Sequence, residues 1–103
     1  MTDRISCCVP FCRRTIGKDK LAETHNEWIC QKHWAMVPKS LKRRKRVTEQ
    51  LWERSNDRFL DQVRAQECGF TWPQHGRVMA ARDLAVKIWE RCKAAAIERA
   101  AGI

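Results

Sequence analysis

The chain has 103 residues, which is enough for one small domain with an appended segment but too few for two separate full-size cores. Lysine and arginine number 21 against 12 acidic residues, and residues 1–46 alone hold 12 basic and 4 acidic side chains. This local excess favours an anionic partner, and because no apolar run approaches the ~20 residues of a membrane span, we expect nucleic acid and not a membrane.

Six cysteines in so short a chain raise the question of disulfides. The opening residues MTDRISCC have no apolar signal-peptide core, so we expect a reducing, cytoplasmic setting in which the cysteines remain thiols. Thiols grouped with a histidine are typical of metal sites. Cys68 and Cys92 lie outside that group, and we predict that both are small buried apolar side chains.

The segment CCVPFC supplies the first pair of candidate ligands. Cys8 and Cys12 flank a turn that contains Pro10, whose fixed backbone angle helps two thiolates converge. Adjacent cysteines rarely bind one ion, so either Cys7 or Cys8 is a bystander. The tighter interval favours Cys8, with Cys7 as the alternative.

The segment EWICQKHW supplies the second pair. Cys30 and His33 lie three residues apart at the start of a helix that should begin near Gln31, which places both on one face of its first turn. The sequence therefore predicts a structural Zn²⁺ bound by Cys8, Cys12, Cys30 and His33. Four protein ligands saturate a tetrahedral ion, so no open position for catalysis is expected.

Short strands are expected between the two ligand pairs. Residues 13–16 and 27–30 read as the arms of a hairpin around a polar turn that begins at Gly17, too small to persist without the metal. His25 lies in this polar stretch, and we expect it to face solvent and not the metal.

A long helix is predicted from Pro38 to about residue 67, because the interval after this proline contains neither glycine nor proline. Its apolar stripe is expected to consist of Leu41, Val47 or Thr48, Leu51, Trp52, Phe59, Leu60 and Val63. Residues 68–76, with two glycines and a proline, read as a connector.

A second helix is predicted over residues 77–100. Its apolar side is expected to consist of Val78, Ala81, Leu84, Ala85, Ile88, Trp89, Cys92, Ala95 and Ala96. The predicted fold is therefore mostly α: a treble-clef-type zinc module over residues 1–37, with a short β-hairpin and a helix, followed by an antiparallel two-helix hairpin over residues 38–103. Such a hairpin buries little by itself, so we expect it to pack on the zinc module, on a second copy as a homodimer, or on another protein.

The most basic stretch of the chain is KSLKRRKR, at the start of the first long helix. Phosphate contacts would relieve the repulsion among its cations, and binding would then depend strongly on salt. An acidic protein partner and plain solvation are the alternatives, and the sequence does not distinguish DNA from RNA. The candidate nucleic-acid contacts are Lys39, Lys42, Arg43, Arg44, Lys45 and Arg46, extended by Arg13, Arg14 and Lys32.

The segments CCVPFCRR and EWICQKHW resemble the small treble-clef zinc proteins found among bacteriophage and prophage reading frames. The first segment is also similar to the opening of THAP-type DNA-binding fingers. The resemblance covers about the first 40 residues, and the interval between the ligand pairs is too short for the DNA-reading strand of the THAP family. It implies a zinc fold and a phage or prophage protein in the host cytoplasm, and it implies no particular activity.

These observations predict a zinc-stabilised protein that binds DNA or RNA through a basic helix. The alternative is an interaction module that binds or inhibits a host or phage protein through the helical hairpin. We do not expect an enzyme, because the one convincing metal site is closed and a nuclease needs a metal with open positions. His25 and Asn26 are the only adjacent pair that suggests a nuclease of the histidine-asparagine-histidine type.

Overall fold

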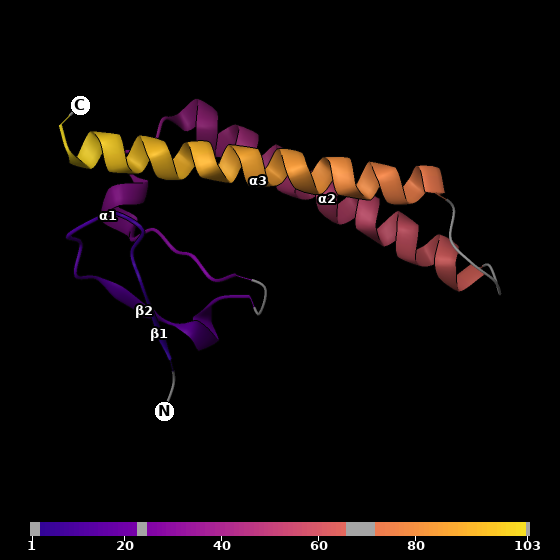
Figure 1. Cartoon of the computed structure of the whole chain (residues 1–103), viewed down its shortest axis with the longest axis horizontal. Helices are drawn as coiled ribbons and strands as arrows, with labels where there is room; N and C mark the ends of the chain where they lie inside the picture. Colours follow the sequence, from indigo (N-terminus) through magenta and orange to yellow (C-terminus); the bar gives the residue numbers. More distant parts are fainter. Residues whose placement is uncertain (1–2, 23–24, 66–71, 103) are drawn as a thin grey trace. The chain divides into compact units, whose positions relative to one another are not determined.

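The computed structural model describes residues 3–22, 25–65 and 72–102 (Figure 1). Its elements are, in chain order, β1 (Arg4–Ser6), β2 (Thr15–Gly17), the 3-10 turn η1 (Lys18–Lys20), α1 (Gln31–Trp34), α2 (Lys39–Ala65) and α3 (Trp72–Ala100). The chain is mostly helical, with a two-stranded antiparallel hairpin followed by two long antiparallel helices that pack together. The predicted fold class is confirmed.

The chain forms two compact units. One unit consists of Met1–Pro38 together with Cys92–Ile103, and the other of Lys39–Arg91. The sequence predicted modules over residues 1–37 and 38–103. In the structure, the end of α3 belongs to the same compact unit as the amino-terminal residues, so α3 contributes to both units.

The small sheet differs from the predicted hairpin. β1 pairs with β2, with Ile5 opposite Ile16 at its centre, whereas residues 27–30 are not the partner of β2. Trp28 instead forms a single parallel bridge with Cys7. The predicted pairing of the two segments is therefore wrong, and the reason is that the chain before Cys7 is itself extended and occupies the edge of β2.

The second long helix begins earlier than predicted. α3 includes Pro73 and Gly76, which were assigned to the connector. Proline is accepted in the first turn of a helix, where its missing N–H group would have had no partner. Residues 68–71 of the predicted connector, including Cys68, lie outside the described residues.

Two contacts fix how α2 and α3 pair within the second unit. The ammonium group of Lys45 lies 5.7 Å from the ring centroid of Trp89, and the rings of Phe59 and His75 lie 5.8 Å apart. Lys45 and Phe59 are fourteen residues apart, as are their two partners. The antiparallel register is therefore constant along the hairpin.

The inward side of α3 is small and apolar, as predicted. Its buried residues are Val78, Ala81, Ala85, Ile88, Cys92 and Ala96. Trp89 and Ala95 are half-buried, and only Leu84 of the predicted stripe is exposed. Steps of three and four residues give this stripe the spacing of a helix–helix seam.

The inward side of α2 is mixed in polarity, which the sequence did not predict. The residues that recur on it at steps of three and four are Leu41, Lys45, Thr48, Trp52, Ser55, Phe59 and Gln62, all buried or half-buried. The other members of the predicted stripe do not lie on this side. These residues are exposed: Val47, Leu51, Leu60 and Val63. The hydroxyl of Thr48 donates to the carbonyl of Lys45 at 3.0 Å, which satisfies this buried polar group.

Among the described residues, no helix combines the length and apolar character that crossing a bilayer requires.

Candidate metal centre

Four side chains of the first unit converge on one point. The ligand atoms of Cys7, Cys12, Cys30 and His33 all lie within 4.8 Å of one another. Cys7 follows β1, Cys12 closes the next turn, and Cys30 immediately precedes α1, which carries His33. Three thiol sulfurs and one imidazole nitrogen are a donor set that binds divalent metal.

The distances within the cluster agree with tetrahedral coordination. The Sγ atom of Cys7 lies 3.8 Å from Nδ1 of His33, and the sulfurs of Cys12 and Cys30 lie 3.9 Å apart. Sγ of Cys30 and Nδ1 of His33 are 3.1 Å apart. Zinc bonds of about 2.3 Å to sulfur and about 2.0 Å to nitrogen place neighbouring ligand atoms about 3.5 to 3.8 Å apart at tetrahedral angles. The cluster therefore needs little rearrangement to hold an ion.

A tight turn positions Cys12. The backbone N–H of Cys12 donates to the carbonyl of Val9 at 3.2 Å, with Pro10 in the second position of the turn. Phe11 occupies the third position with φ of 67°. Positive φ at this position and proline before it are the features of a type II turn. Burial of Val9 anchors the base of the turn.

The second half of the site is positioned by the start of α1. The backbone N–H of Cys30 donates to the sulfur of Cys7 at 3.3 Å, which connects the two ligand segments directly. The N–H of Trp34 donates to the carbonyl of Cys30 at 2.8 Å and begins the helix. His33 then lies one turn from Cys30 on the same side, as the spacing predicted.

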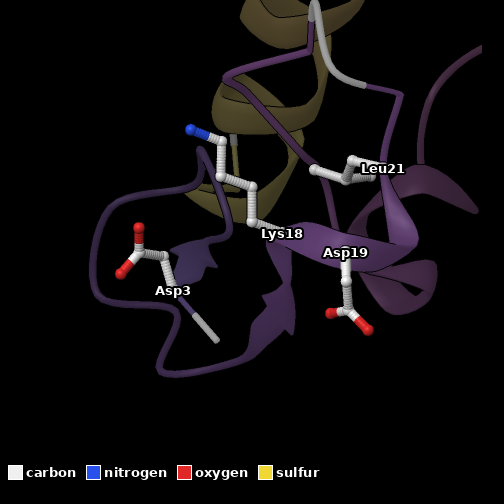
Figure 2. Close-up of a pocket in the computed structure, with 4 residues that line it drawn as sticks. All are labelled: Asp3, Lys18, Asp19 and Leu21. Atoms are coloured by element: carbon white, nitrogen blue, oxygen red, sulfur yellow. The ribbon is translucent and has the colours of Figure 1, made fainter. Parts of the chain in front are cut away.

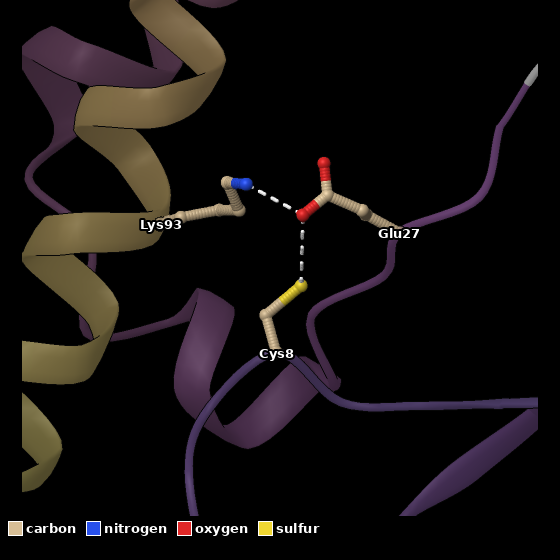
Figure 3. Close-up of polar contacts among 3 residues, drawn as sticks. All are labelled: Cys8, Glu27 and Lys93. Atoms are coloured by element: carbon tan, nitrogen blue, oxygen red, sulfur yellow. Dashed lines mark hydrogen bonds and ion pairs between the residues drawn. The ribbon is translucent and has the colours of Figure 1, made fainter.

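The structure corrects the choice between the two adjacent cysteines. Cys7, and not Cys8, belongs to the cluster. Cys8 lies with its sulfur 3.9 Å from Oε2 of Glu27, which also binds Lys93 (Figure 3). Successive side chains of an extended segment point in opposite directions, so one of the two had to face away. The extended run that leads into Cys7 was the sequence feature that could have identified it.

The thiols of the first unit differ in acidity. Burial raises the pKa of Cys7 and of Cys8. Burial alone would also raise the pKa of Cys30, but the backbone of His33 and the thiols of Cys7 and Cys12 outweigh it, and the pKa is lowered. A metal binds thiolates, so the lowered pKa of Cys30 favours the form in which this cysteine would bind an ion.

Two other features of the first unit do not form a site. His25 is exposed and is not part of the cluster, as expected. A hollow beside η1 is lined by Leu21 and by Asp3, Lys18 and Asp19, and the charged ends of these three point in different directions (Figure 2). Side chains that do not converge offer no common point for a ligand.

The predicted nucleic-acid contacts fall into three groups. On α2, Lys39, Arg43, Arg44 and Arg46 are exposed. Lys42 and Lys45 are half-buried, and Lys45 forms an ion pair with Glu49 at 2.6 Å while it covers Trp89. Arg13, Arg14 and Lys32 are exposed on the first unit. Lys45 therefore belongs to the hairpin interface, and the exposed cations around it are the better candidates for contact with phosphate.

Exposed cations at regular spacing on α3 were not predicted from the sequence. Arg44, Leu51 and Arg58 recur every seven residues on α2, and Arg77, Leu84 and Arg91 do so on α3, all of them exposed. These positions border the buried stripe of each helix, and the register of the hairpin aligns Arg44 with Arg91 to within one residue. Pairing the two helices in antiparallel heptads was the step that could have found Arg91.

Comparison of the chain with protein-family models, with curated proteins and with solved structures finds no match. The chemistry of the site and of the cationic surfaces therefore carries the functional argument.

Proposed function

We propose that this protein is a zinc-stabilised nucleic-acid-binding protein. The metal would be held by Cys7, Cys12, Cys30 and His33, and the phosphates by the exposed cations at the start of α2. DNA and RNA share the phosphate chemistry on which the proposal rests, so the experiment below includes both.

The placement of the cations of α2 carries the proposal. Lys39, Arg43, Arg44 and Arg46 lie in the first two turns of the helix, and its first turn holds no acidic residue. Within the described residues, none of these four has an ion pair with a carboxylate. The amino-terminal end of a helix carries a partial positive charge, so cations there are unfavourable both with the helix and with one another. Bound phosphates would relieve both effects.

Arg91 supports the same surface. The register of Lys45 with Trp89 and of Phe59 with His75 puts the exposed Arg91 of α3 level with the start of α2 along the hairpin, where it would add a cation to those of α2. A row of cations on two helices offers more phosphate contacts than a single helix, and each contact adds to the salt dependence of binding.

A structural metal fits the donor set better than a catalytic one. Three cysteines and one histidine fill the four positions of tetrahedral zinc, so no position remains for water or substrate. Two strands of three residues each do not form a stable hairpin alone, and a metal would supply the missing stability to the first unit.

The proposal is tested by fluorescence anisotropy with the zinc-loaded full chain and labelled duplex DNA, single-stranded DNA and RNA. Affinity should fall steeply between about 50 and 200 mM salt. The triple variant Lys39→Gln, Arg43→Gln, Arg46→Gln should weaken binding by at least about tenfold. It should also reduce the salt slope, which is the slope of the logarithm of affinity against the logarithm of salt concentration, by about two to three.

A matched control removes three cations elsewhere, with the changes Arg64→Gln, Arg82→Gln and Arg99→Gln. It has the same net charge as the triple variant and should bind like the unaltered chain. Equal losses of affinity in the two variants would show that only net charge matters and not the position of the cations. Binding that does not weaken as salt rises would refute the proposal.

A further inference from the structure

Phe11 stands out in the first unit because of both its backbone and its surroundings. Its φ of 67° lies in the left-handed region, which a bulky side chain rarely adopts. Among the described residues, no other residue except glycine has positive φ. The side chain is nevertheless fully exposed, so no packing within the chain compensates for this conformation.

The turn that holds Phe11 is rigid. Pro10 fixes the preceding backbone angle, the N–H of Cys12 closes the turn on Val9, and Cys12 belongs to the metal cluster. The aromatic ring is therefore presented at the tip of a fixed turn. Glycine would adopt this backbone without strain, so an exposed phenylalanine here suggests a use for its side chain.

Two cations follow the turn directly. Arg13 and Arg14 are exposed, and neither has an ion pair with a carboxylate among the described residues. Arg13 directly follows Cys12, so it is the nearer of the two to the turn along the chain. The tip of the turn thus combines an aromatic face with adjacent positive charge.

We propose that Phe11 stacks on an unpaired base of a single-stranded nucleic acid while Arg13 holds a neighbouring phosphate. This inference rests on the proposed function and narrows its substrate to strands with accessible bases. An aromatic ring beside cations is the combination by which proteins hold single strands, since every base has a face to stack on while paired bases do not expose theirs.

The test uses the zinc-loaded full chain and a short single-stranded oligonucleotide that carries 2-aminopurine, whose fluorescence reports stacking. A duplex of the same sequence serves as the second probe. Phe11→Gly should weaken single-strand binding by about tenfold or more, since stacking on one base contributes that much. It should remove the fluorescence change and alter duplex affinity by less than about twofold.

Two further variants separate stacking from folding. Phe11→Gly relieves the left-handed backbone, so its melting temperature should be equal to or higher than that of the unaltered chain. Phe11→Trp should keep the single-strand affinity and the fluorescence change, because its ring also stacks. Met36→Ala removes another exposed apolar side chain of the same unit and should bind like the unaltered chain.

The outcomes distinguish this inference from the proposed function. Stacking by Phe11 would be overturned if Phe11→Gly kept its single-strand affinity within about twofold of that of the unaltered chain. It would also be overturned if the affinities for single strand and duplex fell equally. In either case, salt-dependent binding would leave the proposed function standing. Absence of binding to every nucleic acid would refute the proposed function itself. If Phe11→Gly lost single-strand affinity while the triple variant of α2 bound normally, the nucleic acid would contact the turn and not the helix.

Discussion

Lys93 of α3 forms an ion pair with Glu27, the residue just before Trp28, and so connects segments sixty-six positions apart. The side chain of Lys93 is 15% exposed and that of Glu27 is 45% exposed, so the ion pair is partly shielded from solvent. It joins the end of α3 to the part of the chain that supplies Cys30.

Lys93→Met should destabilise the first unit modestly. The change keeps the length of the side chain and removes its charge, and a half-exposed pair contributes about 1 kcal/mol or less. Urea unfolding measures the loss. Lys87→Met, at an exposed position of the same helix, should have no measurable effect, and an equal loss in both variants would contradict the role of the ion pair.

The adjacent cysteines should differ in metal binding. Cys7→Ser removes a ligand and should reduce bound zinc to well below one equivalent per chain, because serine is a poor zinc ligand. Cys8→Ser should retain a full equivalent. Native mass spectrometry of both variants checks this, and the reverse result would show that Cys8 is the ligand.

Removal of the metal should open the first unit selectively. In the presence of a chelator, the amide of Cys8, which donates to the carbonyl of Trp28 at 2.8 Å, should lose protection from hydrogen exchange. The amides in the middle of α2 should keep most of theirs. Protection at Cys8 that survives chelation would show that the fold does not depend on the ion.

The hairpin should depend strongly on Ile88. This side chain is 2% exposed, and Ile88→Ala should lower the free energy of unfolding by about 2 to 4 kcal/mol through lost burial and the cavity that remains. Val86→Ala, two residues away and 48% exposed, should change it by less than about 0.5 kcal/mol. Similar values for the two variants would contradict the assigned helix face.

Lys45 should be dispensable for nucleic-acid binding although it lies inside the basic run. Lys45→Met keeps a long side chain over Trp89 and should change duplex affinity by less than about twofold. Arg46→Met, at the exposed neighbouring position, should reduce the salt slope by about one. Measurement of both slopes by anisotropy checks this, and a reduction in Lys45→Met as large as that in Arg46→Met would show that Lys45 contacts phosphate.

The long helices were predictable because their sequence features are local. The absence of glycine and proline over residues 39–65 and the regular spacing of small apolar residues on α3 both follow from helix geometry. Cys12, Cys30 and His33 were predictable for the same reason, since ligand spacing is a property of adjacent turns. The predicted apolar side of α3 contains Val78, Ala85 and Cys92, which are buried in the structure.

The failures involve features that depend on partners distant in sequence. β1 has only three residues, and its pairing with β2 is decided by the fold of the whole unit. The inward face of α2 includes Lys45, Ser55 and Gln62, so hydrophobicity alone could not identify it. Cys7 was missed because the choice between adjacent residues depends on the direction of an extended chain.

The shared use of α3 has a consequence for synthesis on the ribosome. The first compact unit is completed by Cys92–Ile103, although its candidate metal ligands lie within the first thirty-three residues. The nascent amino-terminal segment must therefore wait until the last turns of α3 have left the exit tunnel before it can adopt its final contacts. During that interval a metal ion, if bound early by the clustered thiols, would protect them from oxidation and the nascent chain from aggregation.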